Sequence, residues 1–287
     1  MPVQVITDSV ASLPAEDVES LGIERVSLYV HDGDQNLADL DLDPDAFYRR
    51  LADLTHLPTS SQPSVEALVN AFRSAIERGS DALGIFMSEK MSGTVETARM
   101  AADMVREQLP AGRIEILDSR TNSMEEGFVA EAAARAAQAG ESIENCIAVA
   151  TETMQRTRYL FTPETLEYLR RGGRIGTASA LLGGLLQIKP ILTVNEGETD
   201  VFARVRTRQR ALAAIAAKFA DDVNAYGLRD VVVHYIGERG PAEKFAAEYV
   251  QPIAGRPVRV VPVSPVIGVH VGPAVAVAYV TERPSRG

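Results

Sequence analysis

The stretch DALGIFMSEKMSGTVETARMAADMVREQ, residues 81–108, decides the fold that the sequence predicts. Its apolar start, 81–87, has the length of a buried strand, and the apolar spacing over 94–108 is that of a helix. A short turn rich in serine and threonine joins the two. A strand followed directly by a helix is the unit from which parallel sheets with helical covers are built.

The same alternation continues on both sides of this stretch. Strands are predicted at 3–7, 23–30, 81–87 and 113–117, and helices at 44–54, 64–78, 94–108, 123–139 and 142–156. The first half of the chain is therefore expected to form a three-layer α/β/α domain with a parallel sheet.

The second half has a different pattern, in which strands follow one another more often. A helix is expected in PETLEYLRRGGRIG (163–176), strands at 188–194, 201–207, 231–236, 258–263 and 274–280, and helices at 208–225 and 241–250. This pattern predicts a smaller α/β domain with a mixed sheet. We place the N-terminal domain at residues 1–158 and the C-terminal domain at 159–287, with a ligand between them.

Composition and charge exclude several classes of function. The 287 residues include 29 Lys+Arg and 39 Asp+Glu, so the formal charge is 29 − 39 = −10, which repels nucleic acid phosphates. The most apolar stretch, 266–280, is too short to span a membrane. A single cysteine, Cys146, excludes an intramolecular disulfide. We expect a cytoplasmic protein with no nucleic acid partner and no membrane-spanning segment.

Signatures of cofactor sites are missing from the sequence. It contains no GxxxxGK[ST] loop and no GxGxxG after a strand, so binding of ATP or NAD by this chain is not expected. None of the four histidines lies three to five residues from another, and no Cys/His cluster occurs. The sequence therefore predicts neither a cofactor nor a metal site.

Hydroxyl and acidic side chains follow several of the predicted strands. They occur in TDSVAS (7–12), MSEKMSGT (87–94) and LDSRTNS (117–123), and PTSSQPS (58–64) adds a fourth hydroxyl-rich segment before a helix. Each hydroxyl could simply cap a helix. Because the carboxyl ends of parallel strands share one edge, where helix N-termini present free N–H groups, the set also fits a small anion.

Two later segments each have a structural and a functional interpretation. TASALLGGLLQI (177–188) is either a core helix or a set of small residues that leaves room for an apolar ligand. His270 in VIGVHVGPA (266–274) is either a satisfied core histidine or, because Gly272 and Pro273 follow it, part of a loop that faces the cleft.

The residues alone leave two further functions open. Ser92 with His270 could act in a serine-dependent acyl or phosphate-ester hydrolase, although no GxSxG sequence surrounds Ser92. The hydroxyl-rich edge alone would also suit a regulatory module that senses a small anion.

Eight segments, taken in order, closely resemble the DegV family, the fatty-acid-binding proteins of bacterial fatty acid kinase systems. They are ITDSVASLP (6–14), TSSQPS (59–64), MSGT (91–94), LDSRTNSMEEGF (117–128), LEYLRRGGRIG (166–176), LLGGLLQIKPIL (181–192), RVRTRQRAL (204–212) and IGVHVGPA (267–274). The resemblance implies two α/β domains and a long-chain fatty acid in a buried apolar tunnel between them. It also implies a non-enzymatic carrier that presents the carboxylate to a separate fatty acid kinase.

By the same resemblance, Ser60, Ser92 and His270 bind the fatty acid carboxylate. Ser60 stands where the family has threonine, so Thr59 remains an alternative contact. The further headgroup neighbours implied are Thr59, Ser61, Gly93 and Thr94. Arg206 and His270 are the residues implied to meet the kinase.

Overall fold

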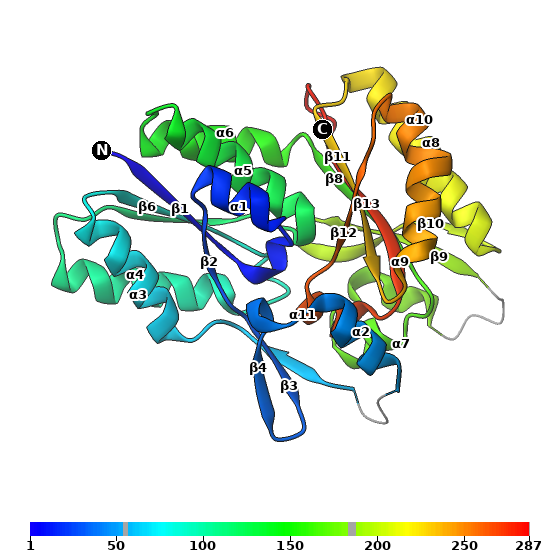
Figure 1. Cartoon of the computed structure of the whole chain (residues 1–287), viewed down its shortest axis with the longest axis horizontal. Coiled ribbons are helices and arrows are strands. Elements are labelled where there is room, and N and C mark those ends of the chain that lie inside the picture. Colours follow the sequence, from blue (N-terminus) through cyan, green and yellow to red (C-terminus); the bar gives the residue numbers. More distant parts are fainter. Residues whose placement is uncertain (54–56, 183–187, 287) are drawn as a thin grey trace.

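The first half of the chain forms a parallel sheet. The computed structural model describes residues 1–53, 57–182 and 188–286 (Figure 1). The first sheet has the strand order β2-β1-β6-β7, with every neighbouring pair parallel. Its strands are β1 (Val3–Asp8), β2 (Glu24–Val26), β6 (Asp81–Phe86) and β7 (Ile114–Asp118).

Helices cover both faces of the first sheet. One face carries α3 (Val65–Glu77) and α4 (Thr94–Gln108), and the other carries α1 (Ala15–Leu21), α5 (Ser123–Gln138) and α6 (Ile143–Met154). The three-layer α/β/α arrangement is as expected from the sequence. Apart from α1, each of these helices lies within a few residues of its predicted range.

The second sheet is mixed, which confirms the expectation for the second half. Its order is β10-β9-β8-β13-β11-β12, and β11 pairs in parallel with β12 while the other pairs are antiparallel. Its outer face is covered by α8 (Arg208–Tyr226), α9 (Arg239–Phe245) and α10 (Gln251–Ala254). The strands are β8 (Thr157–Pro163), β9 (Lys189–Asn195), β10 (Glu198–Val205), β11 (Asp230–Ile236), β12 (Arg259–Pro262) and β13 (Ala274–Val280).

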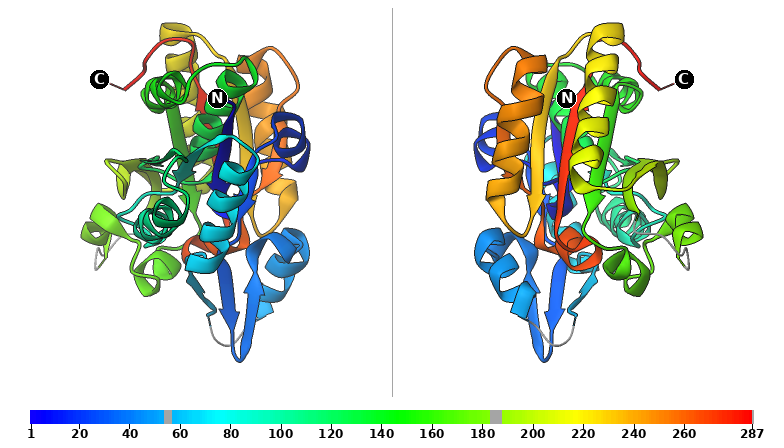
Figure 2. Two further views of the ribbon diagram at one scale, coloured as in Figure 1. Left: turned by 90° about the vertical axis from the view of Figure 1, so that its left-hand side faces the viewer. Right: turned by 90° about the vertical axis from the view of Figure 1, so that its right-hand side faces the viewer.

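A third, small sheet was not predicted. It consists of β3 (Tyr29–Asp32), β4 (Gln35–Ala38) and β5 (Thr59–Ser61) in the order β4-β3-β5, so β5 is an edge strand. The β3–β4 hairpin projects below the two larger sheets in both side views (Figure 2). Beside this sheet lie α2 (Pro44–Asp53), α7 (Glu167–Arg171) and α11 (Pro265–Val271).

The single strand predicted at 23–30 is wrong, because the chain changes sheets within it. Two hydroxyl groups make the turn: Ser9 Oγ accepts from the Leu28 N–H at 3.1 Å, and Ser27 Oγ accepts from the Leu40 N–H at 3.1 Å. These bonds replace the ladder bonds that a continuous strand would make. Glu24–Val26 therefore stays in the first sheet and Tyr29–Asp32 joins the small one.

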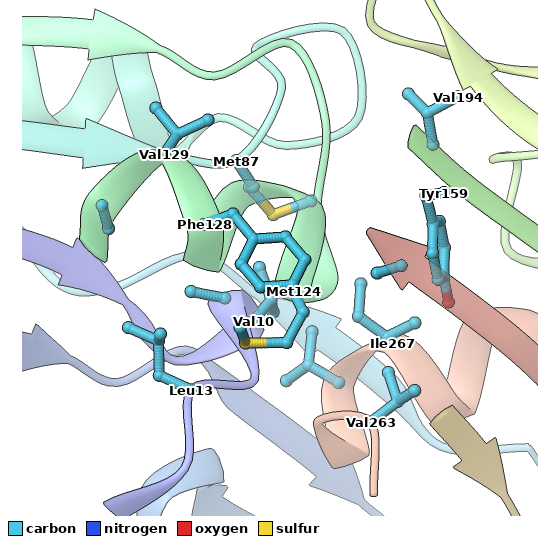
Figure 3. Close-up of a cluster of buried hydrophobic side chains, with 14 of the residues drawn as sticks. Val10, Leu13, Met87, Met124, Phe128, Val129, Tyr159, Val194, Val263 and Ile267 are labelled. Atoms are coloured by element: carbon cyan, nitrogen blue, oxygen red, sulfur yellow. The ribbon is translucent and has the colours of Figure 1, made fainter. Parts of the chain in front are cut away.

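Helix α5 lies between the two larger sheets and packs against both, on β1 and β6 of one and on β8 and β13 of the other. The largest apolar cluster fills this layer. In Figure 3, Val10, Met124 and Phe128 approach from the first half of the chain, and Tyr159 and Ile267 from the second half. The division proposed at 158/159 falls within β8, the first strand of the second sheet.

The structure also bears on the two segments that had both a structural and a functional interpretation, 177–188 and the segment around His270. The loop expected around His270 is wrong: Ser264 caps α11 by accepting from the Val266 N–H at 3.2 Å, and His270 lies in its last turn. Within 177–188, Gly176–Leu181 forms a 3-10 turn and 183–187 lies outside the described residues.

Candidate functional site

A cavity of about 690 Å³, including space at its open mouth, lies where the three sheets meet. The enclosed space that a water molecule can occupy is about 70 Å³, so side chains around the cavity must move apart to admit a larger ligand. The lining comes from both sides of the 158/159 division. The described lining residues are Leu28, Ser60, Ser61, Gln62, Met87, Met91, Ser92, Gly93, Asn122, Tyr159, Phe161, Leu169, Arg174, Val194, Thr199, Val266, Ile267, His270 and Val271.

One part of the lining is apolar and closely packed. Tyr159 and Phe161 on β8 stack with ring centroids 5.2 Å apart, and Leu169 on α7 lies beside them in the same cluster. Met87, which directly follows β6 and is labelled in Figure 3, also lines the cavity. These four side chains are at most 5% exposed. They offer an aliphatic ligand a dry surface.

The polar part of the lining is centred on a serine and a histidine from distant parts of the chain. Ser60 on β5 and His270 on α11 are joined by a hydrogen bond of 2.7 Å between Oγ and Nε2. β5 is positioned by its pairing with β3, in which Ser60 lies opposite Val30, and α11 packs against it. Both residues are half-buried, so this pair lies nearer to solvent than the apolar wall.

His270 is held as a neutral imidazole. Burial, with a smaller contribution from the charge of Arg174, lowers its pKa to about 4. Its Nδ1 is buried and has no hydrogen-bond partner among the described residues. A buried lone pair without a partner costs less than a buried N–H without one, so we infer that the proton is on Nε2. His270 then donates to Ser60 Oγ, and the Ser60 hydroxyl can donate to a ligand.

Glycine at position 172 makes room for this imidazole. A Cβ there would lie 2.3 Å from His270 Nδ1, closer than any ordinary contact. Gly172 ends α7, and its carbonyl accepts from Arg174 Nη1 at 2.6 Å. The turn after α7 therefore places the histidine and an arginine beside each other.

Arg174 is the only formally charged side chain in the described lining. Its Nε donates to the carbonyl of Met91, another lining residue, at 3.1 Å, and its side chain is exposed. A positive charge with no lining carboxylate to oppose it favours an anionic ligand.

Ser92 approaches the cavity from the turn before α4. Its Oγ lies 2.9 Å from Thr94 Oγ1, and its N–H donates to the Ser88 carbonyl at 3.1 Å. A Cβ on Gly93 would lie 2.9 Å from Gln62 Nε2, so glycine allows the β5 segment to come this close. The start of a 15-residue helix at Thr94 adds a positive dipole end near Ser92.

The structure groups most of the residues named from the sequence. Ser60, Ser61, Ser92, Gly93 and His270 line the cavity. Thr94 is buried behind Ser92 and bonds to it. Thr59 and Arg206 are exposed and outside the described lining.

The serine–histidine pair differs from the one considered for a hydrolase. His270 Nε2 bonds to Ser60, and the structure shows no hydrogen bond between His270 and Ser92. Because Nδ1 lacks a carboxylate partner in the described part of the chain, the third member of a triad is missing there.

Sequence reasoning did not single out Arg174, Gln62 or Asn122 as cavity residues. Gln62 and Arg174 do lie within quoted segments, TSSQPS and LEYLRRGGRIG, but local pattern cannot tell a cavity residue from a solvated one. The hydroxyl-rich segment 7–12 has another role, because Asp8 accepts from the N–H groups of Val10 and Met87, each at 3.0 Å.

No group of three His, Cys, Asp or Glu side chains in residues 1–53, 57–182 and 188–286 is arranged to hold a metal ion. Within the same residues, no helix is long and apolar enough to cross a membrane.

Comparisons with known proteins place the chain in one group. A family model described as "Uncharacterised protein, DegV family" matches residues 2–282. A DegV domain-containing protein of Clostridium acetobutylicum is 40% identical over 287 residues, covering 100% of both chains. One from Clostridium perfringens is 38% identical over 283 residues, covering 98% of this chain and 100% of the relative.

Solved structures agree with these sequence relatives. A DegV family protein from Thermus thermophilus, described with fatty acid binding, is 30% identical with a TM-score of 0.86, covering 98% of this chain and 100% of its own. DegV of Bacillus subtilis, described as a fatty acid binding protein, is 29% identical with a TM-score of 0.87, covering 98% and 99%. A stearic acid-binding protein from Eubacterium ventriosum is 25% identical with a TM-score of 0.88, covering 98% of each.

Proposed function

The chain belongs to the DegV family, and from this premise we propose that it binds a long-chain fatty acid in the cavity between its two larger sheets. The fatty acid binding described for the relatives from Thermus thermophilus and Bacillus subtilis supports the proposal. In this chain the observation that carries it is the cavity itself, which has an apolar wall at Tyr159 and Phe161 and a hydroxyl-rich, positively charged mouth.

The chemistry of an amphiphile matches the two parts of the lining. We assign the carboxylate to Ser60, Ser92 and His270, with Ser61, Gly93 and Thr94 around them. Ser60 rather than Thr59 is the β5 contact, because only Ser60 lines the cavity. The hydrocarbon chain lies against the apolar wall.

The tail and the headgroup contribute differently to binding. Burial of about 15 methylenes at ~0.8 kcal/mol each gives roughly 12 kcal/mol before ordering costs. Each hydrogen bond to a charged carboxylate contributes about 1.5 to 3 kcal/mol. The tail therefore supplies most of the affinity, and the hydroxyl groups fix where the carboxylate lies.

We further propose that the chain is a carrier, not an enzyme, and presents the carboxylate to a separate fatty acid kinase. A carboxylate oxygen attacks the terminal phosphorus of a nucleoside triphosphate on the kinase. An oxygen–phosphorus bond forms, and the nucleoside diphosphate leaves with the electrons of the bond that breaks. The chain needs no cofactor in this scheme, and a cytoplasmic location would supply the triphosphate.

The positions of the polar residues support presentation. Ser60, Ser92 and His270 are half-buried and Arg174 is exposed, whereas the apolar wall is buried. A bound acid would thus have its carboxylate near the surface. We keep His270 and exposed Arg206 as proposed contacts of the kinase.

The first test is mass spectrometry of lipid extracted from the purified, folded protein. A stoichiometric C14 to C18 fatty acid is expected, and the Ser60→Ala, Ser92→Ala double variant should retain much less. Absence of lipid from wild-type protein, together with no binding of added palmitate, would contradict the proposal.

One observation favours a second candidate, a serine-dependent hydrolase. The Ser60–His270 distance of 2.7 Å is that of a nucleophile and its base, although His270 could act as a base only in the other tautomer, with the proton on Nδ1. Steady turnover of long-chain acyl esters, abolished by Ser60→Ala, would support this candidate. Flat progress curves from a protein that binds palmitate would exclude it.

A third candidate, a sensor of small anions, would bind acetate as tightly as palmitate. Measuring the affinity of the protein for both acids therefore distinguishes the sensor from a fatty acid carrier.

A further inference from the structure

The deeper part of the cavity lining contains two polar side chains. Asn122 directly precedes α5 and Tyr159 lies on β8, and both residues line the cavity. They are 6% and 2% exposed, whereas Ser60, Ser92 and His270 are half-buried. The proposed carboxylate contacts therefore lie nearer to solvent than these two side chains, which face a different part of the ligand.

The side-chain amide of Asn122 has a poor partner for a buried group. Its Nδ2 donates to Met91 Sδ at 3.3 Å, and a thioether sulfur is a weak acceptor. Asn122 is the N-cap residue of α5, but its side chain makes no capping hydrogen bond. The usual structural reason for an asparagine at the start of a helix is thus absent. The amide can still donate to an oxygen atom of a ligand.

A short chain of polar groups connects Asn122 to Tyr159. Ser123 Oγ donates to Asn122 Oδ1 at 3.2 Å, so the lone pairs of the Ser123 hydroxyl are left to accept from Tyr159. Burial raises the pKa of the Tyr159 hydroxyl, and its hydrogen bond with Ser123 opposes this rise. The Tyr159 hydroxyl is therefore neutral, and after donating to Ser123 it keeps a lone pair that can accept from a ligand.

The backbone holds Asn122 and Ser123 in a constrained turn. Ser123 has a φ of 54°, a left-handed conformation that residues other than glycine seldom adopt. Such conformations persist only where the surrounding structure enforces them, and they are common at ligand sites. In this turn Asn122 contributes to the cavity lining instead of capping the helix that follows it.

An alcohol group matches the two side chains. Asn122 can donate to a ligand oxygen and Tyr159 can accept from a ligand hydroxyl, and a hydroxyl group both accepts and donates. A charged group would lack an opposite charge there, because buried Glu125 is already paired with Arg286 and the lining residue Arg174 is exposed. A plain hydrocarbon chain would remove water from both polar side chains without replacing its hydrogen bonds, which is unfavourable.

We propose that the cavity takes a long-chain fatty acid that carries a hydroxyl group on its chain, and that Asn122 and Tyr159 bind this hydroxyl. The inference rests on the proposed function, because the carboxylate remains at Ser60, Ser92 and His270. It narrows the ligand class from fatty acids in general to hydroxy fatty acids.

The first test compares four acids of equal chain length. Stearate is the reference, and 2-hydroxystearate, 12-hydroxystearate and 18-hydroxystearate carry the hydroxyl beside the carboxylate, along the chain and at its end. Wild-type protein is expected to bind the 12- or the 18-hydroxy acid about tenfold more tightly than stearate. The 2-hydroxy acid should stay within about twofold of stearate, because its hydroxyl cannot reach the deeper lining. Equal affinities for all four acids would overturn the proposal.

Two variants test the assigned contacts. Tyr159→Phe removes the hydroxyl and keeps the ring, and Asn122→Leu removes the amide at similar volume. Each should reduce the tenfold preference for the hydroxy acid to about threefold or less. Tyr226→Phe is the matched control, because Tyr226 is on α8 outside the described lining, and it should keep the wild-type preference. Equal losses of stearate and of the hydroxy acid in both cavity variants would show a purely structural role and overturn the subsite.

The same measurements separate this inference from the proposed function. Failure of wild-type protein to bind any of the four acids would contradict fatty acid binding itself. Normal binding of stearate without a preference for a hydroxyl on the chain would overturn the hydroxyl subsite alone.

Discussion

Ser60 Oγ and His270 Nε2 lie 2.7 Å apart, although 210 residues separate them in the sequence. The bond joins the edge strand of the small sheet to the last turn of α11. Neither element belongs to the first, parallel sheet. Segments added to the doubly covered sheet therefore supply this half of the polar end, and Ser92, from the turn between β6 and α4, supplies the other.

Ser60→Ala is expected to weaken palmitate binding about tenfold, equivalent to ~1.4 kcal/mol. The variant removes the hydroxyl that donates to the carboxylate and leaves His270 Nε2 without its partner. Ser60→Thr should stay within about twofold of wild type, because it keeps the hydroxyl. Titration calorimetry checks both, with Thr59→Ala as control. Wild-type affinity in Ser60→Ala would exclude Ser60 as a headgroup contact.

Gly172→Ala should disturb the site without unfolding the protein. The new methyl group would lie 2.3 Å from His270 Nδ1, so the imidazole must move and its bond to Ser60 must break or lengthen. We expect a several-fold loss of palmitate affinity and a shifted His270 signal by NMR. Gly240→Ala is the matched control, because nothing lies within 4 Å of its added Cβ. Equal behaviour of the two variants would contradict this role for Gly172.

The main architecture could be predicted because it is encoded locally. Each of the helices α2 to α6 has apolar residues at helical spacing over ten or more positions, and the strand–helix order fixes a parallel sheet. The small sheet was missed because β3, β4 and β5 have only three or four residues, too few for an alternating pattern.

The site was less predictable than the fold. Local pattern identified Ser92 and the segment containing Ser60, and it offered Ser92 with His270 only as a hydrolase pair. The grouping of both serines with His270 around a carboxylate followed from family resemblance. Arg174 lies in RRGGR, which looks like an exposed basic run, and only the turn after α7 brings it to the cavity. The buried Glu125 and Glu126 of α5 also have no local signal, because their burial depends on distant segments: Glu126 accepts from Thr7 on β1, and Glu125 is paired with Arg286.

Raising the pH from 5 to 8 is expected to lower the free energy of unfolding. Burial raises the pKa of Asp8 from 3.8 to about 7 and also raises that of nearby Glu126. Between pH ~4 and ~7 the folded protein thus binds more protons than the unfolded chain. Stability then falls as pH rises, by up to ~1.4 kcal/mol per pH unit for one such carboxyl.

Urea unfolding of Asp8→Asn at pH 5, 6.5 and 8 checks this pH dependence. The variant is expected to be less stable at every pH, because Asp8 accepts two backbone N–H bonds, but to show a smaller slope. Glu107→Gln, which removes an exposed carboxylate, should keep the wild-type slope. An unchanged slope in Asp8→Asn would show that Asp8 does not titrate in this range.

Arg286→Ala should destabilise the fold by about 3 kcal/mol, because it leaves the fully buried carboxylate of Glu125 without its cation. Glu125 also accepts from Thr121 Oγ1, and the adjacent Asn122 lines the cavity, so ligand affinity should fall as well. The Glu125→Gln, Arg286→Ala double variant should recover part of the stability. Thermal unfolding checks both. A double variant less stable than Arg286→Ala would contradict the pairing.

Arg174→Gln should raise the pKa of His270, but not to the ordinary value of 6.5. Burial is the larger cause of the depression to about 4, and the positive charge of Arg174 is the smaller one, so removing the charge removes only part of the shift. Arg174→Lys keeps the charge and should leave the titration midpoint close to wild type. NMR titration of the imidazole signals measures both. A midpoint of 6.5 or above in Arg174→Gln would mean that His270 is solvated, and the neutral imidazole that orients Ser60 would then have to be abandoned.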